Sequence, residues 1–279
     1  MYEKLYKNQL DVIGIQNNNF KYILTEFDKG VKWITLNRPK RLNALNYPLI
    51  MEIINVIENS VKNKKIRVIV IKGAGKCFST GDDLKKMGPN GVQFAPLDDG
   101  SQLPHQRMVR LIRQIEKPVI ALLHGYCMGA GFDLALACDF RIAANNLEIG
   151  DHRASRAICV MSGGSWFLPR IVGFAKATEI ILTGKHLNAK EAYEIGLITQ
   201  YFSENEFEKE SEKFIQKIAQ MPTKCLGYNK TMLNYSLRND LFPSLKNEFK
   251  LYCKNIATKD FGEGMKSFQE NREPKFIGK

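Results

Sequence analysis

Two glycine-containing turns, each placed after a short apolar run, constrain the fold of this chain more than any other feature. The first follows the β-branched run Val68 to Ile71 and has the sequence Phe78-Ser79-Thr80-Gly81-Asp82-Asp83-Leu84. The second follows Pro118 to Leu123 and runs from Gly125 to Leu134. Continuous β-branched runs are typical of strands buried on both faces of a sheet. In α/β sheets ligands gather where such strands end, so the two turns mark a candidate site.

Strands and helices alternate through the middle of the chain. The apolar spacing predicts a hairpin over 21–36, strands at 68–71, 118–123, 140–144 and 197–202, and helices at 47–61, 106–115, 132–137, 171–182 and 189–195. This alternation predicts an α/β fold. After Ser203 the strand pattern stops, and amphipathic segments at 204–220, 223–238, 242–257 and 259–270 predict helices only.

These patterns divide the chain into three segments. We interpret residues 1–19 as an N-terminal extension, residues 20–202 as the α/β core and residues 203–279 as a helical C-terminal region. The stretch from Lys85 to Leu103 is rich in glycine, proline and aspartate, which predicts a mobile loop.

Composition excludes several other classes of protein. No apolar run approaches the roughly 20 residues that a membrane-spanning helix needs, and the first 20 residues lack the apolar centre of a signal peptide. We therefore expect a cytoplasmic protein without a membrane partner. The 6 cysteines and 4 histidines have no metal-ligand spacing, which predicts free thiols and no metal ion.

Glycine at a strand end lets backbone N–H groups approach a ligand closely. A helix that begins at Ala130 or Gly131 would add partial positive charge there. Together the two turns have the properties of an oxyanion hole, although either turn alone also fits tight packing of a helix against a strand.

Four stretches, in one order, resemble the enoyl-CoA hydratase/isomerase family, also called the crotonase superfamily. They are Ile34 to Leu45, Phe78 to Met87, Lys117 to Asp139 and Ser162 to Gly173, and the resemblance runs from about Phe20 to the C-terminus. It implies a spiral of ββα units with a helical C-terminal region that forms a homotrimer or a dimer of trimers. It also implies an enzyme of fatty acid metabolism that binds an acyl-CoA thioester and stabilises an enolate, with coenzyme A as part of the substrate and no other cofactor.

By the same resemblance, the thioester carbonyl accepts hydrogen bonds from the backbone N–H groups of Asp82 and Ala130. Donors already aimed at a developing negative charge stabilise it most effectively. The resemblance further implies that a group of residues binds the nucleotide end of coenzyme A, with an aromatic residue near the C-terminus closing over the adenine. These residues are Arg38, Lys40, Arg41, Thr80, Asp83, Leu84 and Phe268.

The acid and base residues depart from the pattern of the family's hydratases. Those enzymes have one carboxylate on the helix of the second turn and another further along the chain. Here Asp133 stands at the first position and Arg153 at the second. Arginine offers only donors, so hydration by two carboxylates is in doubt. Some family isomerases have aspartate at the first position, but Arg153 and Ser162 replace their further acidic pair.

Several interpretations of this region remain open. His152 suits acid or base chemistry near neutral pH, or a structural role. Arg153 and Arg156 could hold a carboxylate on the acyl group. Alternatively, Arg153 could pair with Asp133 or Asp151 and lower the carboxylate's pKa.

We therefore expect an acyl-CoA enzyme of the hydratase or isomerase type, with Asp133, His152 and Arg153 as candidate catalytic residues. The alternatives are thioester hydrolysis, decarboxylation or carbon–carbon bond chemistry on an anionic acyl-CoA, and binding of coenzyme A without turnover.

The net charge of +12 suits a polyanionic partner, namely coenzyme A or a nucleic acid, but also a merely lysine-rich composition. The lysines are spread along the chain, and no basic stripe with interleaved aromatic residues is present. No nucleic-acid partner is expected.

Overall fold

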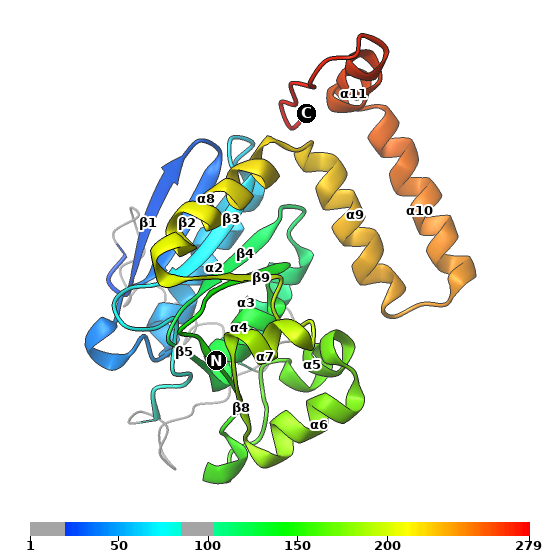
Figure 1. Ribbon diagram of the computed structural model, residues 1–279. Helices are drawn as coiled ribbons and strands as arrows, with labels where there is room; N and C mark the ends of the chain where they lie inside the picture. The colour runs from blue at the N-terminus through cyan, green and yellow to red at the C-terminus, as the bar shows by residue number, and fades with distance from the viewer. Residues whose placement is uncertain (1–19, 85–102) are drawn as a thin grey trace, which may run out of the picture.

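A sheet with the strand order β1-β2-β3-β4-β6-β9 forms the centre of the computed structural model, which describes residues 20–84 and 103–279 (Figure 1). Its strands are β1 (Ile23–Asp28), β2 (Val31–Leu36), β3 (Val68–Gly73), β4 (Val119–Leu123), β6 (Phe140–Ala144) and β9 (Gln200–Phe202). The hairpin of β1 and β2 is antiparallel, and the other neighbouring strands are parallel. The predicted hairpin and α/β class are thus confirmed.

A second, smaller sheet has the order β5-β7-β8. Its strands are β5 (Tyr126–Met128), β7 (Glu148–Gly150) and β8 (His186–Asn188). The sequence did not predict them, because three residues are too few to display the alternation of a strand. β5 belongs to the second glycine turn, so this small sheet holds one half of the candidate site.

Helices follow the strands in chain order. In the core they are α2 (Tyr47–Lys62), α3 (Pro104–Gln114), α4 (Gly129–Ala137), α5 (Gly164–Val172), α6 (Phe174–Thr183) and α7 (Ala189–Glu194), with short 3-10 helices η1 (Pro39–Arg41) and η3 (Ala154–Arg156). The C-terminal helices are α8 (Glu204–Gln220), α9 (Thr223–Ser236), α10 (Leu241–Ile256) and α11 (Lys259–Gln269). The predicted helix over 171–182 was wrong in its start, because Gly173, with φ +80°, separates α5 from α6.

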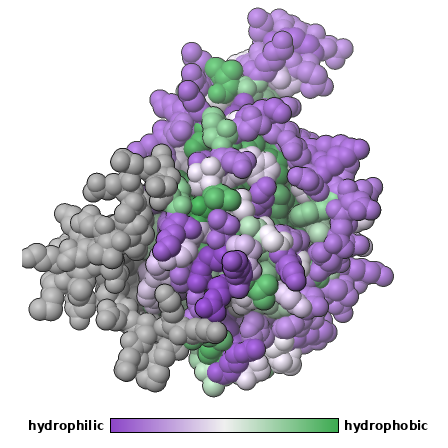
Figure 2. All heavy atoms as spheres, turned by 90° about the vertical axis from the view of Figure 1, so that its left-hand side faces the viewer, coloured by the Kyte–Doolittle hydropathy of each residue, from purple (hydrophilic) through white to green (hydrophobic). Residues whose placement is uncertain are grey.

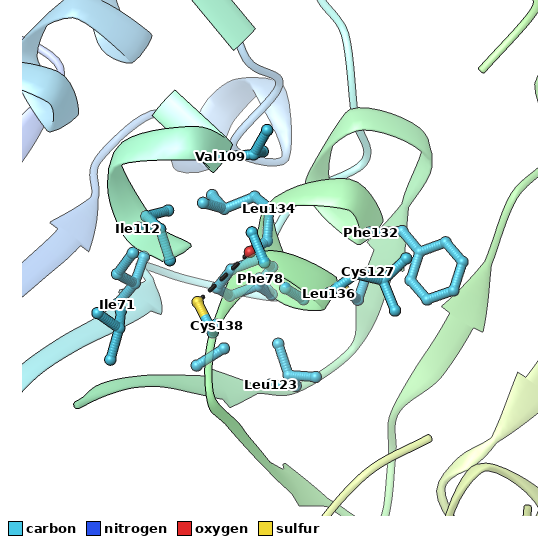
Figure 3. Packing of buried hydrophobic residues seen from close by; sticks show 14 of the residues in the cluster. Ile71, Phe78, Val109, Ile112, Leu123, Cys127, Phe132, Leu134, Leu136 and Cys138 are labelled. Carbon is cyan, nitrogen blue, oxygen red and sulfur yellow. Dashed lines mark hydrogen bonds between the residues drawn. The ribbon is translucent and has the colours of Figure 1, made fainter. Parts of the chain in front are cut away.

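The central sheet is covered on both faces, as the run of β-branched residues in β3 predicts. Ile69 and Ile71 enter the main core with α2, α3 and α4, whereas Val68 and Val70 enter a second cluster with α8. Phe78 is the first residue of the first turn. Figure 3 shows it packed near Leu134 of α4 and Ile112 of α3. The two turns are therefore anchored in one apolar core.

The last two helices, α10 and α11, do not cover the central sheet. α8 lies across the sheet, whereas α10 and α11 stand away from it (Figure 1). Where the described residues are visible on the face at the left of Figure 1, most side chains are hydrophilic, with hydrophobic ones in small groups between them (Figure 2). Half of the exposed large apolar residues of the C-terminal region lie on α10.

Two segments named in the sequence analysis, residues 1–19 and most of the stretch 85–103, lie outside the described residues. Within the described ranges, no helix combines the length and the hydropathy that crossing a bilayer requires.

Candidate active site

The two glycine turns lie side by side because their backbones pair. The Ser79 N–H donates to the Tyr126 carbonyl (2.9 Å), and the Met128 N–H donates to the Ser79 carbonyl (2.9 Å). The Ser79 side chain donates to the Asn43 carbonyl at 2.8 Å and fixes the turn from its other side. Residues distant in the sequence are thus held at one point of the fold.

Gly81 stands at the contact between the turns. Its φ of +91° suits glycine, and a Cβ here would lie 2.8 Å from the Met128 carbonyl oxygen and 3.2 Å from the Ala130 nitrogen. On the opposite side, Leu45 donates to the Gly81 carbonyl and accepts from the Asp83 N–H. Because successive N–H groups of extended backbone alternate in direction, the Asp82 N–H points away from Leu45.

Ala130 lies in the first turn of α4, where backbone N–H groups have no partner within the helix. Gly129 before it has a φ of +54°, again a conformation that favours glycine. Among the hydrogen bonds of the described residues, neither the Asp82 N–H nor the Ala130 N–H is a donor. The structure therefore leaves both predicted donors free near the contact of the turns.

Asp133, one turn further along α4, is fully buried and bound to Arg153. Nη1 of Arg153 donates to Oδ2 of Asp133 at 2.7 Å, and Nη2 donates to Oδ1 at 3.0 Å. The guanidinium also donates to Asp151, from Nε to Oδ1 at 2.8 Å and from Nη2 to Oδ2 at 2.6 Å. Of the alternatives left open for Arg153, the structure has the ion pair, and with both aspartates at once.

Two further residues close this buried cluster around Asp133. The Ser162 hydroxyl donates to Oδ2 of Asp133 at 2.5 Å. A Cβ at Gly164 would lie 2.3 Å from Oδ1 of Asp133, so only glycine fits at the start of α5. Both oxygens of Asp133 therefore already accept hydrogen bonds.

The charges in the cluster oppose the cost of burial. Burial raises the pKa of Asp133, and the Arg153 charge together with hydrogen bonds from Arg153 and Ser162 acts against this rise. For Arg153, burial acts to lower the pKa, but the hydrogen bonds and charges of Asp151 and Asp133 raise it above the usual value. Arg153 is thus held as a cation, and as a permanent donor it cannot serve as a general base.

His152 lies beside the cluster but takes no part in it. Its ring packs edge to face against His186, with 5.9 Å between ring centroids. Burial and then the nearby Arg156 charge lower the pKa of His152, which disfavours the charged form of the ring. A cavity of about 20 Å³ brings several predicted site residues together; its lining is Thr80, Asp82, Leu84, Gly129, His152, Arg153, Arg156 and Ile158.

The residues predicted to bind the nucleotide end occupy varied positions. Nη2 of Arg38 donates to Oδ2 of Asp83 at 2.7 Å, so these two compensate each other and tie the end of β2 to the first turn. Lys40, Arg41 and Leu84 are exposed. The Phe268 ring on α11 is 85% exposed. Thr80 donates to the Leu42 carbonyl at 3.3 Å.

His105 is a site residue that the sequence analysis missed. It is buried on α3, with Nε2 placed 3.0 Å from Oδ1 of Asp82. Its signal was present, because His105, Met108, Val109 and Ile112 share the helical spacing of one buried face. A histidine on the apolar face of a predicted helix therefore indicated a buried polar side chain.

Across the described ranges, no group of three His, Cys, Asp or Glu side chains is arranged to hold a metal ion. The absence of a metal ion and of a separate cofactor stays a prediction.

Comparison with known proteins places this geometry in a known group. The enoyl-CoA hydratase/isomerase family model matches residues 26–279. The chain is 31% identical to the crotonyl-CoA hydratase of Syntrophomonas wolfei, over 93% of this chain and 99% of that protein. It is also 31% identical to the 1,2-epoxyphenylacetyl-CoA isomerase of Escherichia coli, over 93% and 99%.

Solved structures agree with these sequence relatives. The crystal structure of an enoyl-CoA hydratase subunit from Geobacillus kaustophilus superposes with a TM-score of 0.86 at 29% identity, covering 94% of this chain and all of that one. A structure of enoyl-CoA hydratase from Bacillus anthracis gives a TM-score of 0.85 at 31% identity, covering 93% and 100%. The crotonase-like fold expected from the resemblance is confirmed.

The buried cluster leads to a stability prediction. Replacing Arg153 by alanine should lower the free energy of unfolding by about 3–5 kcal/mol, because two buried carboxylates lose their shared cation. Urea denaturation followed by circular dichroism measures the change. The matched control is Lys190→Ala, which removes an exposed ion pair with Glu194 and should cost less than about 0.5 kcal/mol. Equally small losses for both variants would contradict the assigned role of Arg153.

Proposed function

The chain belongs to the enoyl-CoA hydratase/isomerase family, and we propose that it moves a proton, and with it a double bond, along an enoyl-CoA thioester instead of adding water to it. An enzyme of the hydratase/isomerase type acting on acyl-CoA thioesters is what its family membership establishes. The finer assignment depends on the residues of the site.

A backbone oxyanion hole is the part of the proposal shared by both reactions. The N–H groups of Asp82 and Ala130 would donate to the thioester oxygen as negative charge develops there. Their lack of partners within the described residues supports this role, as does the start of α4 at Gly129. Each such donor contributes about 3 kcal/mol to transition-state stabilisation.

The observation that carries the choice of reaction is the contact of Arg153 with Asp133. Water addition by two carboxylates needs a second carboxylate where Arg153 stands, and an arginine cannot accept a proton from water. Isomerisation needs no activated water. The likeness to an enzyme named 1,2-epoxyphenylacetyl-CoA isomerase is consistent with isomerase chemistry. In this proposal Arg153 positions Asp133 and does not anchor a substrate carboxylate.

The proposal also covers how the coenzyme A part of the substrate is bound and where in the cell the protein acts. Lys40 and Arg41, exposed beside the first turn, would attract the phosphates of coenzyme A, and the exposed Phe268 would cover the adenine. Coenzyme A would enter as part of the substrate, without a separate cofactor. A cytoplasmic location and a place in fatty acid metabolism stay predictions.

Two substrates test the choice of reaction. With 3-butenoyl-CoA the protein should form crotonyl-CoA, whereas with crotonyl-CoA it should form little 3-hydroxybutyryl-CoA. Chromatography of the products under identical conditions measures both rates. Hydration as fast as isomerisation would contradict the proposal, and tight binding without either product would indicate a coenzyme A binder without turnover.

The contact of the glycine turns gives a second prediction. Gly81→Ala should lower kcat/KM for the isomerisation by about 100-fold, the effect of losing an oxyanion donor. The added Cβ would push against the Met128 carbonyl and the Ala130 nitrogen. This would move the Asp82 N–H away from the position of the thioester oxygen. Gly262→Ala on α11 is the control, since nothing lies within 4 Å of its added Cβ. Equal activity of the two variants would count against the oxyanion hole.

Helix α10 supports the proposal of a homotrimer or a dimer of trimers. Five of its exposed apolar side chains fall at intervals of three and four residues, which places them on one face of the helix. This stripe consists of Phe242, Leu245, Phe249, Tyr252 and Ile256, and the exposed Leu241 stands at its start. A stripe of this kind at heptad spacing is typical of a surface that packs against another helix. A second copy of this chain is the occupant we propose.

The stripe can be tested by charge. Phe249→Asp should reduce the assembly to single chains, because a carboxylate cannot be buried in an apolar contact without cost. Sedimentation velocity gives the mass, with three or six chains expected for the unchanged protein. Leu24→Asp, on the exposed face of β1, is the control and should leave the mass unchanged. A single-chain mass for the unchanged protein would overturn the proposed assembly.

A further inference from the structure

A buried pair of titratable residues, Asp82 and His105, lies beside the proposed oxyanion hole and outside the Asp133 cluster. Nε2 of His105 and Oδ1 of Asp82 are 3.0 Å apart, and the side chains are 4% and 5% exposed. Asp82 belongs to the first glycine turn and His105 to the first turn of α3, so the pair joins two elements that are distant in the sequence.

The pair is unusual because its polar atoms are buried without well-aligned partners. Within the part of the chain that the structure describes, Oδ1 of Asp82 and both ring nitrogens of His105 lack a hydrogen bond of good geometry, despite the short distance between them. Buried polar groups are nearly always hydrogen-bonded, and a catalytic role is one of the recognised reasons for an exception. Packing alone would have placed an apolar residue at position 105, among Met108, Val109 and Ile112.

The place of Asp82 relates this pair to the thioester. Its own N–H is one of the two proposed donors, and three bonds separate that nitrogen from the carboxyl carbon, so the carboxylate lies within about 4 Å of it. Asp82 also lines the small cavity with Gly129 and Arg153. A thioester carbonyl held by the Asp82 N–H would bring its α-carbon to the same residue that carries this carboxylate.

Within the described residues, the ion-pair partner of Asp82 is His105. The Tyr47 ring stands edge-on to His105, with 5.8 Å between ring centroids, and burial followed by the charge of Asp82 raises the pKa of Tyr47. Arg38 is bound to Asp83 of the same turn, whereas Arg153 and Arg156 line the small cavity together with Asp82. Asp133, by contrast, has both oxygens occupied by Arg153 and Ser162.

We propose that the Asp82 carboxylate is the base that takes the α-proton of the acyl-CoA, with His105 as the residue that positions it. The electron pair of the C–H bond moves into the bond between the α-carbon and the carbonyl carbon, and the thioester oxygen takes the negative charge. Asp82 then returns the proton at the γ-carbon, and the electron pairs shift back to give the conjugated enoyl-CoA. One proton leaves and one enters, so the step needs no other reactant.

This inference rests on the proposed function and is tested by proton exchange. With 3-butenoyl-CoA in D₂O, proton NMR follows both isomerisation and the entry of deuterium from solvent. Asp82→Asn should lower kcat by about 100-fold or more, the usual contribution of a general base. His105→Gln should lower kcat by about 10-fold, since it leaves the base in place but poorly held. The Kd for butyryl-CoA, which cannot isomerise, should remain that of the unchanged protein in both variants, because the backbone donors are retained.

The control is His124→Gln, which alters a histidine whose Nε2 contacts only the Gly75 carbonyl among the described residues, and it should leave kcat unchanged. If Asp82→Asn does not fold, His105→Gln and His105→Phe carry the test through the same split between kcat and Kd.

Unchanged kcat in the Asp82 and His105 variants, or a parallel loss of kcat and butyryl-CoA binding, would overturn the inference and leave the pair a structural contact. Loss of exchange in Asp133→Asn alone would assign the base to Asp133. If the unchanged protein neither isomerises nor exchanges, the proposed function itself fails, a result distinct from failure of the pair.

Discussion

The close contact of two glycine turns is the constraint on which the site depends. Gly81 leaves room for the Met128 carbonyl and the Ala130 nitrogen where any side chain would collide. Pairing of Ser79 with the backbone of β5 holds the turns in register, and packing of Phe78 into the core holds them in depth. Two backbone N–H groups without partners among the described residues are the product of this packing. Catalysis by such donors needs no reorganisation, because the fold has already fixed their direction.

A second layer of order comes from charge. Arg153 between Asp133 and Asp151 forms a buried network of opposite charges, and replacing Arg153 alone would leave two buried carboxylates without their cation. Within this network both oxygens of Asp133 accept hydrogen bonds, which hold the carboxylate in one orientation. Asp82, by contrast, pairs with no lysine or arginine in the described parts of the chain, and its partner there is His105. Position and charge thus separate two aspartates that composition cannot distinguish.

The helices and strands predicted correctly from the sequence are those with strong periodic patterns. The β-branched run of β3 and the long amphipathic helices α2 and α8 carry many periodic positions, and they lie where the spacing predicted. The strands β5, β7 and β8 have three residues each and no measurable period. The break at Gly173 was missed because apolar residues continue across it at helical spacing. The candidate site residues Asp82, Ala130, Asp133 and Arg153 were found through a resemblance, and the periodic patterns alone would have marked only the turns.

By itself the sequence determined the α/β class and the two glycine turns, since these are properties of residue type and local spacing. The resemblance to the family added that an arginine stands where a carboxylate was expected. Only the tertiary structure decided which carboxylates Arg153 contacts. Asp151 is two residues away and Asp133 twenty, and the contact with Asp133 depends on how the fold brings these two segments together. The pairing of Asp82 with His105 was decided in the same way, by the packing of α3 against the first turn. Local pattern fixes which elements form, whereas the packing of their side chains fixes which charged groups meet.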